Sequence, residues 1–418
     1  MHITNRRTTT CKTAILALAA VAARAGDNNT NSLFFSCDGA KVLVGASPVH
    51  GHAQGEEAPH CFGGRSSGDG AVVTMPRLRG RWAQDHSPDS RAPYWGLSCP
   101  FEMNHYSCAP GKQEPRSPRA EYARSLQFEP EECRLDPFDN MGFVQGMKGR
   151  HLEFMGDSIT RQHFISVVCH LLPSVDWAAT HTFWAQNHGD TPAPGCTPGT
   201  SPPSSAGSWA CRRRYHNVLA NVRRPNNTAC VFLTTGTRVC YRGMLSRGVN
   251  QYLRSFASNI LVVANAGLHS GQAKYQPVVE SLVKKYKSID CKKRPVLVYR
   301  EHIAQHFKGN EDGSFARMEH IDPTSSPVLN VPCRARISDK QLQSRVEIER
   351  RVLTEASIPL LPVYDSSTDI GCAHIGAQAK GTADCTHFCQ PGVPDYWARL
   401  LSNLVSRGIN WGRSSCAS

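Results

Sequence analysis

The stretch His151-Leu-Glu-Phe-Met-Gly-Asp-Ser158, with the apolar-periodic run Thr160–Leu172 behind it, decides the fold class of this chain. The alternation over His151–Met155 predicts a short strand, Gly156-Asp157-Ser158 a tight turn, and the following run a helix. A serine at such a turn lies at the exposed end of a sheet, beside helix amides that can stabilise an oxyanion. Ser158 is therefore a candidate nucleophile, although Gly, Asp and Ser are also common turn and N-cap residues.

Further strands and helices alternate along the rest of the chain. This order predicts a parallel α/β sheet. The expected strands are Ala229–Leu233, Ile260–Ala264, Val296–Arg300 and Ile358–Tyr364, and the expected helices between them are Lys274–Lys287 and Lys340–Glu355. We assign residues 146–410 to one catalytic domain.

The N-terminus has the pattern of a secretory signal over residues 1–25. Arg6, Arg7 and Lys12 precede the ten-residue apolar run 14–23, and Ala23-Arg24-Ala25 gives small residues around a cleavage site. A membrane-spanning helix needs about 20 residues, so no stable span is expected, with a short signal anchor as the alternative. The pattern predicts the secretory pathway, either the Golgi lumen or the extracellular space.

The cysteines predict a disulfide framework. Of 17 cysteines, Cys11 lies in the signal, and 17 minus 1 leaves an even 16. No C-x-x-C pair occurs, so a metal site is not expected. We expect a loosely ordered leader over 26–90 and a cysteine-rich segment over 91–145. The disulfide candidates are Cys99, Cys108, Cys133, Cys385 and Cys389.

The charge of the chain is clearly basic. The formal net charge is +13, and removing the four positive residues of the signal leaves 13 minus 4, or +9. Basic clusters such as Arg212-Arg213-Arg214 favour a polyanionic partner. For a secretory protein an acidic or sulfated polysaccharide is favoured over nucleic acid, and a simple solvated surface is the alternative.

A second motif, Asp384-Cys-Thr-His387, places a carboxylate three residues before an imidazole. An Asp at this spacing can orient the His within one local turn, so that the imidazole takes a serine proton and the carboxylate stabilises the imidazolium. A surface pair is the alternative, but the flanking Cys385 and Cys389 suggest a rigid loop. Pro394 is well placed in the first turn of a last helix through Leu404.

Two blocks carry a family resemblance. The GDS-x-x-R block (Gly156–Arg161) and DCTHFCQPGVPDYW (Asp384–Trp397) resemble the PC-esterase or trichome birefringence-like family, polysaccharide O-acetyltransferases of the SGNH superfamily. With the similar stretches Gly80–Trp82, Cys99–Phe101 and Arg300–Phe307, the resemblance covers roughly residues 80 to 406. It implies an SGNH-hydrolase-like three-layer αβα sandwich with a central mostly parallel sheet, plus a disulfide-rich N-terminal segment.

The resemblance also implies roles for individual residues. Ser158 would form the acyl-enzyme, His387 would be the general base and Asp384 would orient it. Oxyanion support would come from the amides of Ser158 and Gly156 and from Arg161, Asn265 and Gly267, and the candidates for substrate contact are Arg300 and His306. His306 has a packed core ring as its alternative. Leu268 and His269 depart from the family's Asn-Thr-Gly-His-Trp-Trp, and Ile303-Ala304 replaces its Ser-Pro, so the resemblance does not carry over the substrate choice of the plant xylan or pectin enzymes.

The predicted function is O-acetylation of a cell-wall or extracellular polysaccharide through an acyl-serine intermediate. A carbohydrate acetyl esterase is the alternative, because only the acceptor separates transfer from hydrolysis. A non-catalytic binder of acidic glycans is the second alternative. No cofactor is expected beyond an acetyl donor. Since the sequence shows no acyl-CoA signature, the donor could be handed over by a partner protein.

Overall fold

The computed structural model describes the parts of the chain that carry the fold. These are residues 33–34, 43–44, 58–62, 77–85, 94, 99–108, 118–188, 217–220, 222, 228–243, 252–266, 272–308, 333–334, 336–337, 344–377 and 383–409. The predicted signal over residues 1–25 and the predicted support residue Gly267 lie outside the described residues.

A six-stranded sheet forms the centre of the molecule, in the order β10-β9-β8-β5-β7-β6. Its members are β5 (His151–Gly156), β6 (Thr228–Phe232), β7 (Arg238–Gly243), β8 (Ile260–Ala264), β9 (Val296–Arg300) and β10 (Leu360–Leu361). All neighbours pair in parallel except β6, which is antiparallel to β7. The predicted parallel α/β sheet is confirmed, and β7 is the strand that the sequence analysis did not predict.

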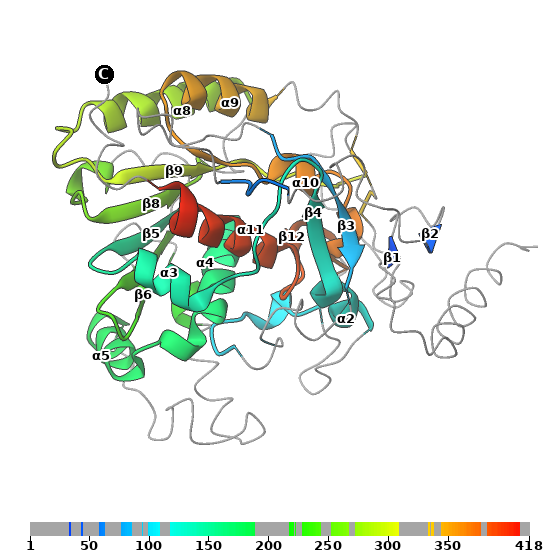
Figure 1. Cartoon of the computed structure of the whole chain (residues 1–418), viewed down its shortest axis with the longest axis horizontal. Coiled ribbons are helices and arrows are strands. Elements are labelled where there is room, and N and C mark those ends of the chain that lie inside the picture. The colour runs from blue at the N-terminus through cyan, green and yellow to red at the C-terminus, as the bar shows by residue number, and fades with distance from the viewer. Residues whose placement is uncertain are drawn as a thin grey trace, which may run out of the picture.

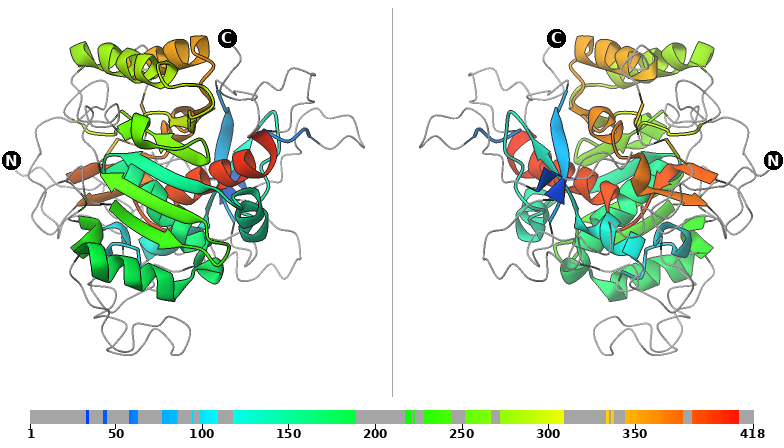
Figure 2. Two further views of the ribbon diagram at one scale, coloured as in Figure 1. Left: turned by 90° about the vertical axis from the view of Figure 1, so that its left-hand side faces the viewer. Right: turned by 90° about the vertical axis from the view of Figure 1, so that its right-hand side faces the viewer.

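Side chains of the central strands point alternately into two cores, one on each face of the sheet. Phe154 and Val263 belong to the larger core, whereas Met155 and Val262 belong to the other. The larger core includes residues of α4 (Ser158–His170) and α11 (Val393–Asn403), and the second lies under α8 (Gln272–Lys287) and α9 (Arg345–Glu355). Helices therefore cover both faces (Figures 1 and 2), which is the SGNH-like α/β arrangement that the sequence predicted.

A smaller antiparallel sheet carries the N-terminal part of the chain. Its order is β2-β1-β3-β4, formed by β1 (Leu33–Phe34), β2 (Leu43–Val44), β3 (Gly80–Gln84) and β4 (Leu126–Pro130). Strand β3 falls within residues 26–90, where a loosely ordered leader was expected. It is ordered because Trp82 is buried, stacks edge-on against Tyr396 of α11, and donates its indole N–H to the carbonyl of Ser366.

The remaining elements lie between and after the strands of these two sheets. They are the 3-10 turns Asn104–Tyr106, Leu172–Ser174, Leu253–Ser255 and Gly371–Ala373, the helices α2 (Pro118–Ser125), α3 (Asn140–Gly146), α5 (Trp177–His188) and α10 (Tyr364–Ser367), the β11 (His374–Ala377) and β12 (Ala383–Phe388) hairpin, and the π-helical turn Leu404–Gly408. Within the described ranges, no helix combines the length and apolar character needed to cross a membrane.

Five disulfides are seen among the described residues. They are Cys61–Cys133, Cys99–Cys169, Cys108–Cys389, Cys230–Cys240 and Cys333–Cys385. All five disulfide candidates named from the sequence are therefore bonded. Four of the five bridges span more than 50 residues, and three of them include a cysteine from residues 61–108.

Candidate active site

Ser158 begins α4 immediately after the central strand β5. Asp157 caps this helix, and its carboxylate accepts the backbone N–H of Ile159 at 3.0 Å and of Thr160 at 3.4 Å. The turn before it requires glycine, because a Cβ at Gly156 would lie 2.3 Å from Oγ1 of Thr160. The sharp turn thus places the Ser158 hydroxyl at the carboxyl edge of the sheet, as the sequence predicted.

His387 and Asp384 meet Ser158 from strand β12. Nε2 of His387 lies 2.7 Å from Oγ of Ser158, and its Nδ1 lies 2.8 Å from Oδ2 of Asp384. Oδ1 of Asp384 accepts the backbone N–H of His387 at 2.9 Å and of Thr386 at 3.1 Å. Carboxylate, imidazole and hydroxyl are therefore linked in the order that general-base activation of a serine requires.

The surroundings of Asp384 keep its carboxyl ionised. Burial alone would raise its pKa, but the charge of His387 and the hydrogen bonds from its ring and from the amides of His387 and Thr386 outweigh burial and lower the pKa to about 2. Because the Asp384 carboxylate stays ionised and accepts the Nδ1–H of His387, it holds the imidazole in the tautomer whose Nε2 can accept the Ser158 proton.

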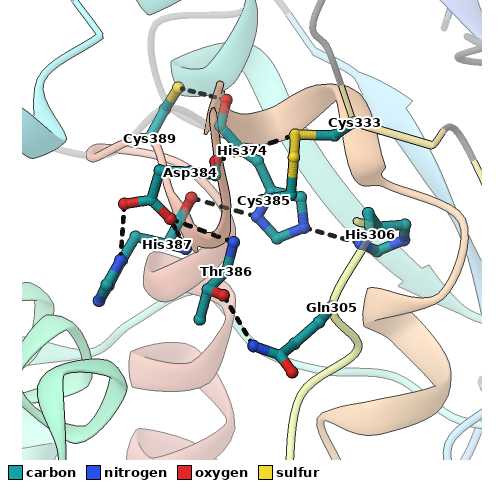
Figure 3. Close-up of a disulfide and its surroundings, with 9 residues drawn as sticks. All are labelled: Gln305, His306, Cys333, His374, Asp384, Cys385, Thr386, His387 and Cys389. Atoms are coloured by element: carbon teal, nitrogen blue, oxygen red, sulfur yellow. Dashed lines mark hydrogen bonds and ion pairs between the residues drawn. A yellow bond between two sulfur atoms is a disulfide. The ribbon is translucent and has the colours of Figure 1, made fainter. Parts of the chain in front are cut away.

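Two disulfides hold the strand that carries this pair. Cys385 is bonded to Cys333 and Cys389 to Cys108, so both sides of His387 are tied to distant segments. Figure 3 shows the Cys333–Cys385 bridge beside Asp384 and Thr386. The rigid loop that the flanking cysteines suggested is instead a disulfide-pinned β-strand.

Tyr106 is a residue of the site that the sequence analysis missed. Its buried ring lies 5.4 Å from the imidazole of His387, centroid to centroid, and its hydroxyl accepts a hydrogen bond of 2.8 Å from Arg161. Arg161 also donates to the carbonyl of Leu219. The feature of the sequence that could have indicated Tyr106 is its position two residues before Cys108. The bridge from Cys108 to Cys389 brings Tyr106 beside His387. Arg161 therefore contacts the packing partner of His387, and its support of an oxyanion stays a prediction.

Asn265 follows β8 at the same edge of the sheet. Its backbone N–H donates to the carbonyl of Met155, and its side-chain amide donates to the carbonyl of Arg300 at 2.8 Å. These bonds fix Asn265 next to the Ser158 turn, since the Gly156 Cβ position lies 3.2 Å from the Asn265 carbonyl. Its oxyanion role stays a prediction.

Two candidates for substrate contact lie in the interior instead. The side chain of Arg300 is 1% exposed, with its guanidinium 5.5 Å from the Trp397 ring and 3.4 Å from Oγ1 of Thr160. His306 is fully buried, and its ring contacts His374 and the carbonyl of Thr368. The expected substrate contacts are therefore corrected, because neither side chain can touch a polysaccharide in this structure. Among the described side chains, no group of three or more His, Cys, Asp or Glu could hold a metal ion.

A family model matches the C-terminal part of this chain. Residues 269–404 match the family model described as "PC-Esterase: GDSL/SGNH-like Acyl-Esterase family found in Pmr5 and Cas1p". This match includes Asp384 and His387, whereas Ser158 lies before it.

Curated relatives extend the similarity over most of the chain. Protein trichome birefringence-like 12 of Arabidopsis thaliana is 22% identical over 78% of this chain and 84% of its own length. Xylan O-acetyltransferase 3 of Oryza sativa subsp. japonica is 23% identical over 79% of this chain and 76% of its own. Xylan O-acetyltransferase 12 of the same rice is 32% identical, but over only 26% of this chain and 21% of its own length.

Proposed function

Because the chain belongs to the PC-esterase and trichome birefringence-like family, we propose that it O-acetylates a polysaccharide through an acyl-serine intermediate on Ser158. The observation that carries this proposal is the 2.7 Å contact between Nε2 of His387 and Oγ of Ser158, with Asp384 on the opposite ring nitrogen. Relatives named xylan O-acetyltransferases make xylan the first acceptor to test.

The first half-reaction loads the serine. Nε2 of His387 takes the proton of Ser158 as Oγ attacks the acetyl carbonyl of the donor. Asp384 stabilises the imidazolium. The tetrahedral intermediate then collapses, the bond to the donor's leaving group breaks, and that group takes the proton from His387. The products are the acetylated Ser158 and the deacetylated donor.

The second half-reaction unloads the serine onto the acceptor. A sugar hydroxyl gives its proton to Nε2 of His387 and attacks the acetyl-serine carbonyl. Collapse of the second tetrahedral intermediate breaks the bond to Oγ, which takes the proton back from His387. Amides at the Ser158 turn and the segment that begins at Asn265 are the proposed oxyanion donors.

An acetyl esterase is the second candidate, favoured by the family description as acyl-esterases. The two activities share the acetyl-serine and differ in whether water or a sugar hydroxyl takes the acetyl group. We propose that the protein works in the secretory pathway, in keeping with its disulfides, and that a partner protein supplies the acetyl donor.

The test uses the oxidised full chain, 4-nitrophenyl acetate as donor and xylan oligosaccharides as acceptor. Ser158→Ala is compared with Ser255→Ala, a serine in the turn before β8 at the opposite edge of the sheet. The transferase is supported if acetylated xylan forms with the native chain and with Ser255→Ala but not with Ser158→Ala. Release to water alone supports the esterase. Xylan binding without acyl turnover in the native chain would leave a glycan-binding protein and overturn both.

A further inference from the structure

A pair of fully buried imidazoles, those of His306 and His374, lies beneath the candidate active site. Nδ1 of His306, in the segment after β9, is 2.7 Å from Nε2 of His374, the first residue of β11. The outer nitrogens each face a backbone carbonyl: Nε2 of His306 faces Thr368 at 3.0 Å, and Nδ1 of His374 faces His387 at 3.1 Å. Figure 3 shows the His374 ring between His306 and the His387 backbone.

Counting protons shows that the two neutral imidazoles cannot complete all three of these contacts as hydrogen bonds. Carbonyls can only accept, so each of the two outer contacts needs an N–H on the imidazole, and the central contact needs a third. Two neutral imidazoles carry only two N–H groups in total. Three complete hydrogen bonds therefore require an extra proton on the pair, and the neutral pair must leave one contact without a hydrogen.

The surroundings indicate which contact loses its hydrogen. Burial lowers the pKa of His306 to about 4. Burial also lowers the pKa of His374, and the charges of His306 and His387 act in the same direction, whereas the hydrogen bond to the His387 carbonyl and the charge of Asp384 raise it. The pair is therefore neutral at neutral pH. The Thr368 carbonyl also accepts the backbone N–H of Ile337 at 3.2 Å, so it keeps a donor when Nε2 of His306 carries no hydrogen. The contact between His306 and Thr368 is therefore the one that can lack a hydrogen at the lowest cost.

From this geometry we propose that His306 and His374 are positioning residues for His387, the base of the function proposed above. Nδ1–H of His306 donates to Nε2 of His374, which leaves the hydrogen of His374 on Nδ1, where it donates to the His387 carbonyl. The His374 ring also stacks on Phe388 at 4.1 Å, so it is held in this orientation. Asp384 thus holds the side chain of His387, while the histidine pair holds its backbone.

Paired amide substitutions test the direction of this chain. An Asn side chain places an amide N–H near the position of Nδ1, whereas Gln places it near Nε2. We expect His374→Asn and His306→Asn to keep kcat within a few-fold of the native value. We expect His374→Gln and His306→Gln to lose about tenfold or more in kcat with a smaller change in KM, because His387 is misplaced. If size and packing alone mattered, Gln would be tolerated at least as well as Asn, and that order would overturn the proposal.

A spectroscopic measurement tests the same point without relying on activity. Long-range ¹⁵N–¹H correlation spectra of histidine-labelled protein, assigned with the two Asn variants, report which ring nitrogen carries hydrogen. At pH 7 we expect both His306 and His374 to carry it on Nδ1, and acidification to add a proton at Nε2 of His306. A hydrogen on Nε2 of His374 at pH 7 would overturn the proposal. An inactive native enzyme with the expected tautomers would instead count against the proposed function alone.

Discussion

Cys385 and Cys389 lie on either side of His387, yet they are not bonded to each other. Cys385 reaches Cys333, 52 residues away, and Cys389 reaches Cys108, 281 residues away. The second bridge also brings Tyr106 against the His387 ring. The position of the proposed base therefore depends on covalent contacts with two segments that are distant in sequence.

Removing one of these bridges should impair catalysis more than removing a remote one. We expect the double variant Cys108→Ser/Cys389→Ser to lose about tenfold or more in kcat, because His387 is displaced from Ser158, and to lose about 2–5 kcal/mol of unfolding free energy. The matched control is Cys230→Ser/Cys240→Ser, in the β6–β7 hairpin at the sheet edge. Equal losses of kcat in both double variants, measured with 4-nitrophenyl acetate, would contradict this prediction.

How far the sequence predicts the fold depends on whether the signal is local. The strand, turn and helix around Ser158 were predictable because alternation, turn residues and helical periodicity all occur within one short stretch. Strand β7 was missed because Arg238 and Arg242 obscure its apolar alternation, and its place in the sheet depends on pairing with β5 and β6.

The candidate site shows the same difference between local and nonlocal features. The spacing of Asp384 and His387 predicts their mutual contact, but not that they lie on a strand. Tyr106 and the burial of Arg300 depend on tertiary packing, which no local pattern encodes. The bridging partner of Cys389 is also nonlocal, since cysteine spacing alone leaves many pairings open.

Asp384→Asn should leave the fold intact and remove most of the activity. An amide in place of the carboxylate no longer holds the imidazole of His387 in the required tautomer, and we expect a fall of about 10⁴-fold in kcat. Because the pKa of Asp384 is about 2, this carboxylate does not cause any loss of activity between pH 4 and 6. The control is Asp290→Asn at an exposed position. Turnover within tenfold of native would remove Asp384 from the proposed mechanism.

Asp384 should also contribute to stability in a defined pH range. Its folded-state pKa lies below the ordinary value of 3.8, so its contribution is present above about pH 4 and is lost as pH falls towards 2. The measured quantity is the unfolding free energy of the native chain minus that of Asp384→Asn. We expect this difference to be about 2 kcal/mol larger at pH 5 than at pH 2. Urea unfolding at both pH values measures this gap, and a gap independent of pH would contradict the prediction.

Tyr106→Phe should separate the ring contact from the hydrogen bond. The variant keeps a ring against His387 but removes the hydroxyl that accepts from the buried Arg161. We expect a loss of about 1–3 kcal/mol in unfolding free energy, because a guanidinium N–H is left without this acceptor, and a fall of only a few-fold in kcat. Tyr106→Ala should reduce kcat much further. If Phe and Ala reduced kcat equally, the ring contact would have no role in positioning His387.

Glu349 of α9 links the second core to the active-site edge. Its carboxyl oxygens accept hydrogen bonds from the hydroxyls of Tyr275 and Tyr299 and, at 2.9 Å, from the backbone N–H of His302. The Tyr299 hydroxyl in turn accepts the N–H of Ala266, beside Asn265. Burial raises the pKa of Glu349 to about 7 despite these hydrogen bonds. The folded protein therefore holds a proton here that the unfolded chain has already released.

This buried carboxyl should make the protein less stable as pH rises. Between the unfolded pKa of about 4.5 and the folded pKa of about 7, the folded state binds more protons than the unfolded state, so the unfolding free energy falls with pH. The loss is about 3 kcal/mol and is complete above pH 7. In Glu349→Gln this component should vanish, whereas the exposed Glu347→Gln of the same helix should behave like the native chain. Urea unfolding at pH 5 and pH 8 measures this loss. If the unfolding free energy changed by the same amount in all three proteins, Glu349 would be ionised at both pH values and the prediction would be wrong.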